Sequence, residues 1–225
     1  MANTIITKIV VLLFIVLGLA APGRAQVGIA AGLEYGTAIF ANKAVFATRP
    51  STGIAAELTF RPRDSRLYPS LSCLFKTITV PVRNSTFSGL DDFADLHQFM
   101  LKLNYRTSDE PSYTAVFLGV GVAQIAPQTN FNDNTGSAIA INDTGSTNLY
   151  PAVELGIRRM WRILPNGGFY LGLEGSVCYI HMHAQNQYYL QQGATVAEAT
   201  IGGDVIVPEI AVTLHYFFMR RGEAD

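Results

Sequence analysis

Charged residues and long apolar runs are both scarce in this sequence. Asp, Glu, Lys and Arg make up 15% of its 225 residues, whereas 49% are hydrophobic, and the formal net charge is -1. Beyond the N-terminal segment, no stretch approaches the roughly 18 consecutive apolar residues that a membrane-spanning helix requires. The near-neutral charge also gives no overall sign of a protein that binds nucleic acid. The apolar residues are therefore dispersed, as they are in a lipid-facing β-barrel.

Cysteine is rare as well, and recognisable cofactor motifs are missing. The two cysteines are Cys73 and Cys178. Export would allow a disulfide, but the strands assigned below place them on opposite faces of the barrel wall, so we predict that they stay unpaired. The sequence has no phosphate-binding loop, nucleotide fingerprint, zinc-finger spacing or nucleophile elbow. We therefore expect no cofactor.

The first 25 residues have the organisation of a secretory signal peptide. Lys8 precedes the apolar run 9–21, and Pro22, Gly23 and Ala25 follow it. A charged start, a short apolar core and a small final residue are the marks of such a peptide. We predict cleavage after Ala25. The domain organisation is then a signal peptide (1–25), an outer-membrane β-barrel (26–218) and a short periplasmic tail (219–225). An uncleaved anchor is the alternative, which the short core and the Pro-Gly break disfavour.

Apolar and polar residues alternate with a period of two throughout the mature chain, and this pattern predicts strands. The eight expected strands lie near residues 27–36, 52–61, 66–77, 95–106, 112–124, 147–160, 167–181 and 204–218. Each has about the length that a tilted strand needs to cross a bilayer. The sequence therefore predicts an all-β protein built as one eight-stranded barrel.

The connections between these strands alternate in length. Short, turn-like connections follow the second, fourth and sixth strands, at 62–65, 108–111 and 164–167. Long polar connections follow the odd-numbered strands and include 130–148 and 185–203. Short periplasmic turns and long external loops are typical of an antiparallel, up-and-down transmembrane barrel.

Each expected strand has one apolar face and one face of small, polar or charged residues. The second kind of face carries five acidic and five basic residues: Glu34, Glu57, Glu154, Glu174, Glu209, Arg61, Lys76, Lys102, Arg106 and Arg158. In a narrow eight-stranded lumen such charges can pair into a network. We therefore predict that the charged faces line the lumen and that the apolar faces contact lipid. A soluble lipocalin-like barrel with an apolar ligand inside is the alternative.

Aromatic residues lie near the ends of the expected strands, where membrane barrels carry two aromatic girdles. They are Tyr35, Phe60, Phe75, Tyr105, Tyr113, Trp161, Phe169, Tyr216 and Phe218. In the fifth strand, Phe117 falls on the inward face beside Gly119 and Gly121. A bulky aromatic residue next to glycines is acceptable packing there.

The segment 207–218 resembles the closing strand of outer-membrane β-barrels, which alternates apolar residues and ends in an aromatic. Tyr216 and Phe218 occupy the terminal positions of that pattern, although seven more residues follow. Over residues 26–218 the chain resembles the small porin-like, or outer-membrane protein beta-barrel domain, family of the Bacteroidetes, with the architecture of the OmpA and OmpX barrels. This resemblance implies a location in the outer membrane, contact with outer-membrane lipid and recognition by the barrel-assembly machinery.

The histidines offer the sharpest local pattern. His181 and His183 share one face of a strand, so both imidazoles could bind one metal ion, but no third ligand is evident nearby. The lipid A deacylase family has a His and a Ser two residues apart on a strand, and here the second position is His183. We therefore expect interfacial polar residues rather than a metal or catalytic site.

These observations favour a non-enzymatic outer-membrane barrel whose external loops act in adhesion, envelope integrity or binding of an unidentified partner. Three alternatives stay open: a narrow pore or small-solute transporter, a lipid A-modifying enzyme, and the soluble ligand-binding barrel. Eight strands leave an interior only just wide enough for side chains, so we expect no open diffusion of sugars.

Overall fold

The computed structural model describes residues 25–40, 50–62, 65–81, 91–127, 137–140, 149–164, 168–192 and 195–218. Eight long strands dominate them: β1 (Ala25–Gly36), β3 (Ser51–Pro62), β4 (Leu67–Pro81), β5 (Asp91–Arg106), β6 (Tyr113–Pro127), β8 (Leu149–Arg162), β9 (Phe169–Gln192) and β10 (Thr195–Phe217). There are also two short strands: β2 (Ile39–Phe40) pairs with β10, and β7 (Ser137–Ala140) pairs with β9. The expected signal peptide and tail lie outside the described residues, apart from Ala25.

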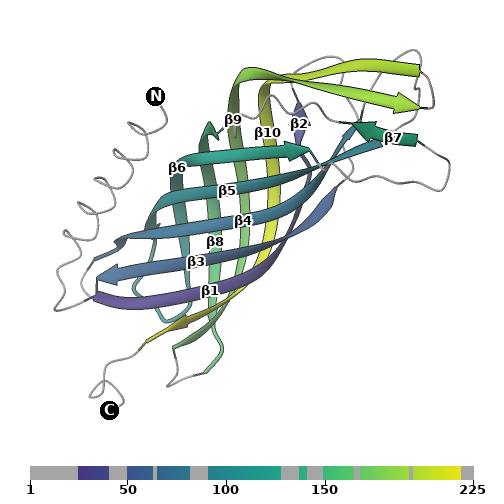
Figure 1. The fold of residues 1–225 in the computed structure, drawn as a ribbon. Helices are drawn as coiled ribbons and strands as arrows, with labels where there is room; N and C mark the ends of the chain where they lie inside the picture. The colour runs from purple at the N-terminus through teal and green to yellow at the C-terminus, as the bar shows by residue number, and fades with distance from the viewer. Residues whose placement is uncertain are drawn as a thin grey trace.

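The eight long strands close into an antiparallel barrel (Figure 1). Each pairs with the next long strand along the chain, and β10 closes the ring by pairing with β1 from Gly28↔Phe217 to Gly36↔Glu209. A closed ladder leaves no long edge with unpaired backbone groups. The prediction of an all-β, eight-stranded, antiparallel up-and-down barrel is therefore confirmed. Among the described residues, no helix is long and apolar enough to span a membrane.

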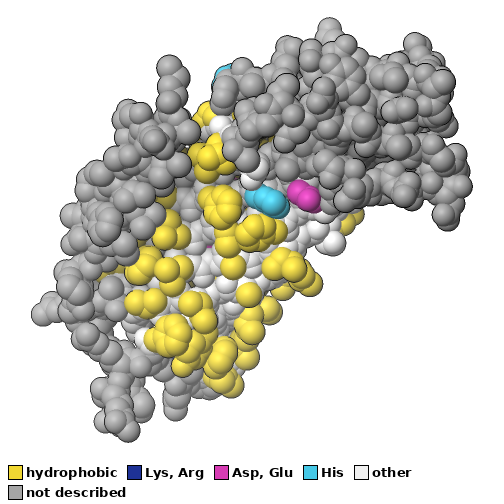
Figure 2. Space-filling model, viewed as in Figure 1, with side chains coloured by type: hydrophobic (Ala, Val, Ile, Leu, Met, Phe, Trp, Pro, Cys, Tyr) yellow, Lys and Arg dark blue, Asp and Glu magenta, His cyan; other side chains and the backbone are white. Residues whose placement is uncertain are grey.

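Side chains alternate strictly between the outside and the inside of the wall. Along β8, Val153, Leu155 and Ile157 are exposed, whereas Glu154 and Arg158 are buried in the lumen. Leu155 is 64% exposed and Arg158 only 2%. Hydrophobic side chains gather over the barrel wall that is visible in Figure 2. The assignment of apolar faces outward and charged faces inward is confirmed.

The two ends of the barrel differ in their connections. At one end, here called the turn end, lie the connections 63–66, 107–112 and 163–168 and both ends of the barrel sequence, 25 and 218. Backbone hydrogen bonds close these turns, as from Thr107 N to Thr114 O at 2.9 Å. β1, β4 and β6 run towards the opposite end, here called the loop end.

The connection after β9 is not the long loop that the sequence predicted. The ladder between β9 and β10 continues to Thr195↔Gln192, with a bulge between Ile201 and Gly203, where Gly203 has a φ of 93°. Most of the expected loop 185–203 is therefore paired strand, and this hairpin extends beyond the rest of the barrel (Figure 1). β7 pairs with β9 over Tyr189–Gln192, so the extension has three strands, whereas β2 pairs with β10 at Val205 and Ile206, next to the end of the β1–β10 ladder.

Two buried apolar clusters fill the lumen towards its ends. The larger lies towards the loop end and contains Ile78, Leu96, Ile125, Ile180, Val205 and Val207. The smaller lies at the turn end and contains Tyr113, Ala115, Met160, Tyr170 and Phe217. Tyr113 is fully buried in this cluster, so its predicted place in an outer girdle is wrong. The polar middle of the lumen is thus enclosed between two apolar layers.

Candidate functional site: the charged lumen

The middle of the lumen holds two sets of ionic side chains, and salt bridges join the members within each set. We call the first the triad, formed by Lys76, Glu34 and Glu209. We call the second the pentad, formed by Lys102, Arg158, Glu57, Glu154 and Glu174. These eight are among the ten residues that the alternation pattern selected. Most are less than a tenth exposed, so their charges depend on each other rather than on solvent.

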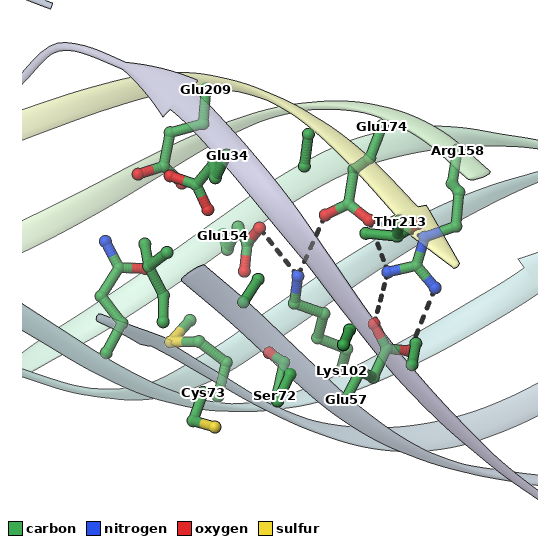
Figure 3. A pocket seen from close by; sticks show the side chains of 18 residues that line it. Glu34, Glu57, Ser72, Cys73, Lys102, Glu154, Arg158, Glu174, Glu209 and Thr213 are labelled. Atoms are coloured by element: carbon green, nitrogen blue, oxygen red, sulfur yellow. Dashed lines mark hydrogen bonds and ion pairs between the residues drawn. The ribbon is translucent and has the colours of Figure 1, made fainter. Parts of the chain in front are cut away.

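Arg158 connects opposite walls within the pentad. Its Nε donates to Glu174 Oε2 at 2.6 Å, and its Nη1 donates to Glu57 Oε1 at 3.0 Å. Glu174 is the register partner of Arg158 on the neighbouring strand β9, whereas Glu57 lies on β3. The guanidinium therefore ties β8 and β9 to β3 through its fixed fork of donors, a geometry that suits carboxylates (Figure 3).

Both lysines reach their carboxylates across a glycine on the strand between them. Lys102 on β5 is in register with Gly119 on β6, which is in register with Glu154 on β8. The Lys102 Nζ–Glu154 Oε1 distance is 3.0 Å, and the same ammonium lies 3.2 Å from Glu174 Oε1. A Cβ at Gly119 would lie 3.3 Å from both Lys102 Cγ and Glu154 Cβ. The glycine thus leaves room for the ion pair.

The triad repeats this arrangement nearer the loop end. Glu34 on β1, Gly53 on β3 and Lys76 on β4 lie in one row. Lys76 Nζ lies 3.3 Å from Glu34 Oε1 and 3.5 Å from Glu209 Oε1, and its side chain is fully buried. One lysine therefore serves two glutamates that come from the paired strands β1 and β10.

Arg61 and Arg106 occupy a different environment from the other eight. Both guanidinium groups lie over the Tyr113 ring, at 5.1 and 5.6 Å from its centroid, and Arg61 also lies 5.7 Å from the Phe217 centroid. Arg106 Nη2 donates to Asp109 Oδ1 at 2.8 Å. These arginines stack on the turn-end apolar cluster, so the structure does not bring them to the lumen glutamates.

Two further residues, which were not among the ten charged residues selected from the sequence, also lie in the lumen. Phe117 lies opposite Gly156, and its ring centroid is 4.4 Å from Lys102 Nζ and 5.6 Å from Arg158 Cζ. His215 is buried, with its Nε2 2.8 Å from Thr213 Oγ1. Alternation placed both side chains inward, but only the three-dimensional stagger of the strands shows what they contact.

Little space remains between these side chains. The cavity that they enclose has a volume of about 30 Å³, and Glu34, Lys102, Glu154, Glu174 and Glu209 are among the residues that line it. That volume holds one or two water molecules. Within the described residues, no group of three or more His, Cys, Asp or Glu side chains could hold a metal ion. The arrangement has room for one or two water molecules but not for an organic substrate.

The outer surface carries several of the aromatic residues singled out by the sequence, and it also carries His181. At the turn end, Phe169 and Tyr216 lie 4.6 Å apart between ring centroids, and Tyr216 and Phe218 lie 5.0 Å apart. At the loop end, His181 Nδ1 lies 2.8 Å from Asp204 Oδ1 on the exposed surface. Hydrogen bonds from His181 and Tyr179 lower the pKa of Asp204 there. The side chain of His183 lies outside the described residues.

The cysteines are unpaired, as predicted. Cys178 is buried in the lumen and Cys73 is half-buried on the outer face. Their side chains lie on opposite faces of the wall, which prevents a disulfide without movement of the backbone.

Comparisons with known proteins give structural matches alone. No family model matches the chain, and no curated protein matches it. The chain is similar to outer membrane protein AlkL, solved by solid-state NMR in DMPC lipid bilayers, with 15% identity, a TM-score of 0.48, and 88% of this chain and 92% of AlkL covered. It is also similar to Neisserial surface protein A (NspA), with 12% identity, a TM-score of 0.48, and 86% of this chain and 99% of NspA covered. Membership of the small porin-like family stays a prediction.

Proposed function

We propose that this chain is a non-enzymatic, integral outer-membrane β-barrel with a closed lumen, which holds the sheet at its loop end outside the cell. The observation that carries this proposal is the inverted distribution of side chains. Leu33, Ile54, Leu155 and Ile210 are between 59% and 68% exposed on the wall, whereas the charged side chains of the triad and pentad point into the lumen.

The outward apolar side chains require an apolar surround. Large hydrophobic residues are exposed on all eight long strands, as with Leu33 on β1 and Leu173 on β9. Soluble proteins rarely expose contiguous apolar patches beyond a few hundred Å². A lipocalin-like barrel would need the opposite arrangement, with an apolar cavity around its ligand. Lipid around the barrel accounts for both faces at once.

The filled lumen favours a scaffold rather than a pore. Apolar clusters occupy both ends, and the charged middle leaves a cavity of about 30 Å³. Salt bridges across the lumen, above all those of Arg158 with Glu57 and Glu174, hold the walls together. A continuous polar path would have to break these contacts. We therefore assign any specific activity to the loop end.

At the loop end, the extension of β9 and β10 gives the protein a structured external part. β7 pairs with the extended part of β9, so the backbone of the extension is organised as a three-stranded sheet rather than as separate loops. Such a platform suits adhesion or binding of a protein partner, because a preorganised surface loses little entropy on association.

Export and assembly complete the proposal. The signal peptide would direct the chain to the periplasm, and Tyr216 and Phe218 at the end of β10 would present the aromatic terminus that the barrel-assembly machinery recognises. The Tyr216 ring contacts those of both Phe169 and Phe218, where the turn-end girdle would lie. The turn end would then face the periplasm.

Fractionation of cells that express the full chain tests this function. We expect the protein in the outer-membrane fraction, and we expect unheated samples to migrate differently from boiled samples on SDS gels, because the closed barrel resists the detergent. A released soluble product with no mobility shift would contradict the proposal. Mass analysis of the fractionated protein would show whether cleavage occurs after Ala25.

A further inference from the structure

In the middle of the lumen, the triad and the pentad together hold more carboxylates than cations. The triad has two glutamates for one lysine, and the pentad has three glutamates for two cations. Arg61 and Arg106, which would have balanced these charges, stack on Tyr113 at the turn end instead. Each set therefore carries one carboxyl group in excess.

The triad shows most clearly how the excess carboxyl group affects its surroundings. Glu34 and Glu209 point towards each other from β1 and β10 (Figure 3). Glu209 Oε1 is buried and has the 3.5 Å ion pair with Lys76 Nζ but no hydrogen bond among the described residues. Gln98 Nε2, which lines the same cavity, has no hydrogen-bond partner among the described residues either. Glu209 and Gln98 are both more than nine-tenths buried, and each therefore has an atom that could accept or donate a further hydrogen bond.

Keeping both Glu34 and Glu209 ionised beside the single ammonium of Lys76 would cost free energy in this buried site. Like charges that share a buried site repel each other, and each also loses its hydration. The charge must be neutralised by something that fits a cavity of about 30 Å³. A proton fits this cavity together with one or two water molecules, whereas a hydrated metal ion needs more room.

We propose that Glu34 and Glu209 share one proton, so that the triad is a proton-binding site inside the barrel. The proton gives the pair one negative charge, which Lys76 balances. The titratable and charged groups that face the pair from other strands are Lys76 on β4, Glu154 on β8 and Cys178 on β9. Lys102 on β5 lines the same cavity. Loss of the proton would leave a second buried charge with no counter-ion.

Infrared spectroscopy of the refolded full chain reads the proton directly. We expect a carbonyl band of protonated carboxylic acid at neutral pH that loses intensity in both Glu209→Gln and Glu34→Gln. The control is Glu110→Gln, which removes an exposed glutamate from a turn. Glutamine has the shape of a protonated glutamate, so both lumen variants should fold. An unchanged band in Glu209→Gln and Glu34→Gln would overturn the proposal.

Stability measured against pH gives an independent readout. The urea midpoint of the wild-type barrel should fall as the pH is raised above neutral, because the shared proton is lost and two carboxylates then repel each other. Glu209→Gln removes that proton and should flatten this alkaline fall. A midpoint that instead depends on sodium or potassium concentration, without a protonated band, would assign the site to a cation and reject the proton.

Discussion

At the scale of single residues, a side chain's face on the strand decides whether its charge matters. Arg158 and Arg159 are neighbours on β8, but Arg158 is buried between Glu57 and Glu174, whereas Arg159 is exposed and its Nη1 donates to Thr114 Oγ1 at 3.1 Å. Removing one partner of a buried ion pair leaves the other charge unpaired and desolvated. A solvent-exposed or interfacial charge has no such dependence.

Substitution of these two arginines should therefore give very different results. We expect Arg158→Leu to lower the free energy of unfolding by roughly 3–5 kcal/mol, because Glu57 and Glu174 lose their counter-ion. The matched control Arg159→Leu should change it by about 1 kcal/mol or less. Urea titrations in detergent micelles measure both. Equal effects of the two substitutions would argue against the pentad as a stabilising network.

Alternation along the sequence predicts a residue's face but not its height in the barrel. This is why Glu34, Lys76, Lys102 and Arg158 could be placed in the lumen from sequence alone. Height depends on the stagger between strands, which no local pattern records. Arg61 and Arg106 therefore seemed equivalent to the other cations, although they lie beside Tyr113 at the turn end. Tyr113 was missed for a different reason: it shares the inward face of Ala115 and Phe117, but its place at the strand end suggested a girdle residue.

At the scale of elements, two rows of residues in register across three strands each place a glycine between a lysine and a glutamate. Gly119 separates Lys102 from Glu154, and Gly53 separates Glu34 from Lys76. In most strands an interior glycine is a weakness, because it adds no packing. Here the missing side chain lets a lysine pass over the intermediate strand. The glycines are thus part of the charge arrangement.

A β-branched side chain at Gly119 should separate Lys102 from Glu154. We expect Gly119→Val to destabilise the barrel by on the order of 1–3 kcal/mol, the usual cost of overpacking a filled interior. Gly175→Val is the matched control, because a Cβ at Gly175 meets no atom within 4 Å. Chemical unfolding midpoints compare the two. If Gly119→Val were as stable as Gly175→Val, the glycine rows would have no steric role.

The extension of β9 and β10 marks the limit of element prediction. The pattern of alternation and turn-like composition located all eight long strands, but it assigned residues 185–203 to a polar loop. Apolar periodicity reports burial against a core or lipid, and a hairpin that leaves the barrel has neither. Its pairing from Asn186↔Ile201 to Gln192↔Thr195 is held by backbone hydrogen bonds, which every sequence can make.

At the scale of the whole molecule, the outward apolar surface should make the barrel depend on lipid. Leu155 is 64% exposed near the middle of β8, whereas Leu149 begins that strand at the loop end. An arginine on the lipid face costs roughly 2–4 kcal/mol at the bilayer midplane but about 0–1 kcal/mol near an interface. We therefore expect Leu155→Arg to impair folding into lipid vesicles and Leu149→Arg to be tolerated. Equal folding yields would favour a water-exposed wall.

The same view of the whole molecule predicts how the barrel responds to a voltage. Among the described residues, apolar clusters lie towards both ends of the lumen, and the charged side chains between them surround a cavity of about 30 Å³. An ion that entered would have to displace Arg158 or a lysine from its glutamates, at the cost of leaving buried charges unpaired. We therefore expect purified protein in planar lipid bilayers to show no steady conductance, under conditions in which a general diffusion porin conducts. Uniform conductance steps would contradict a closed lumen, above all if Glu57→Gln changed their size, because Glu57 can alter the current only if ions pass the pentad.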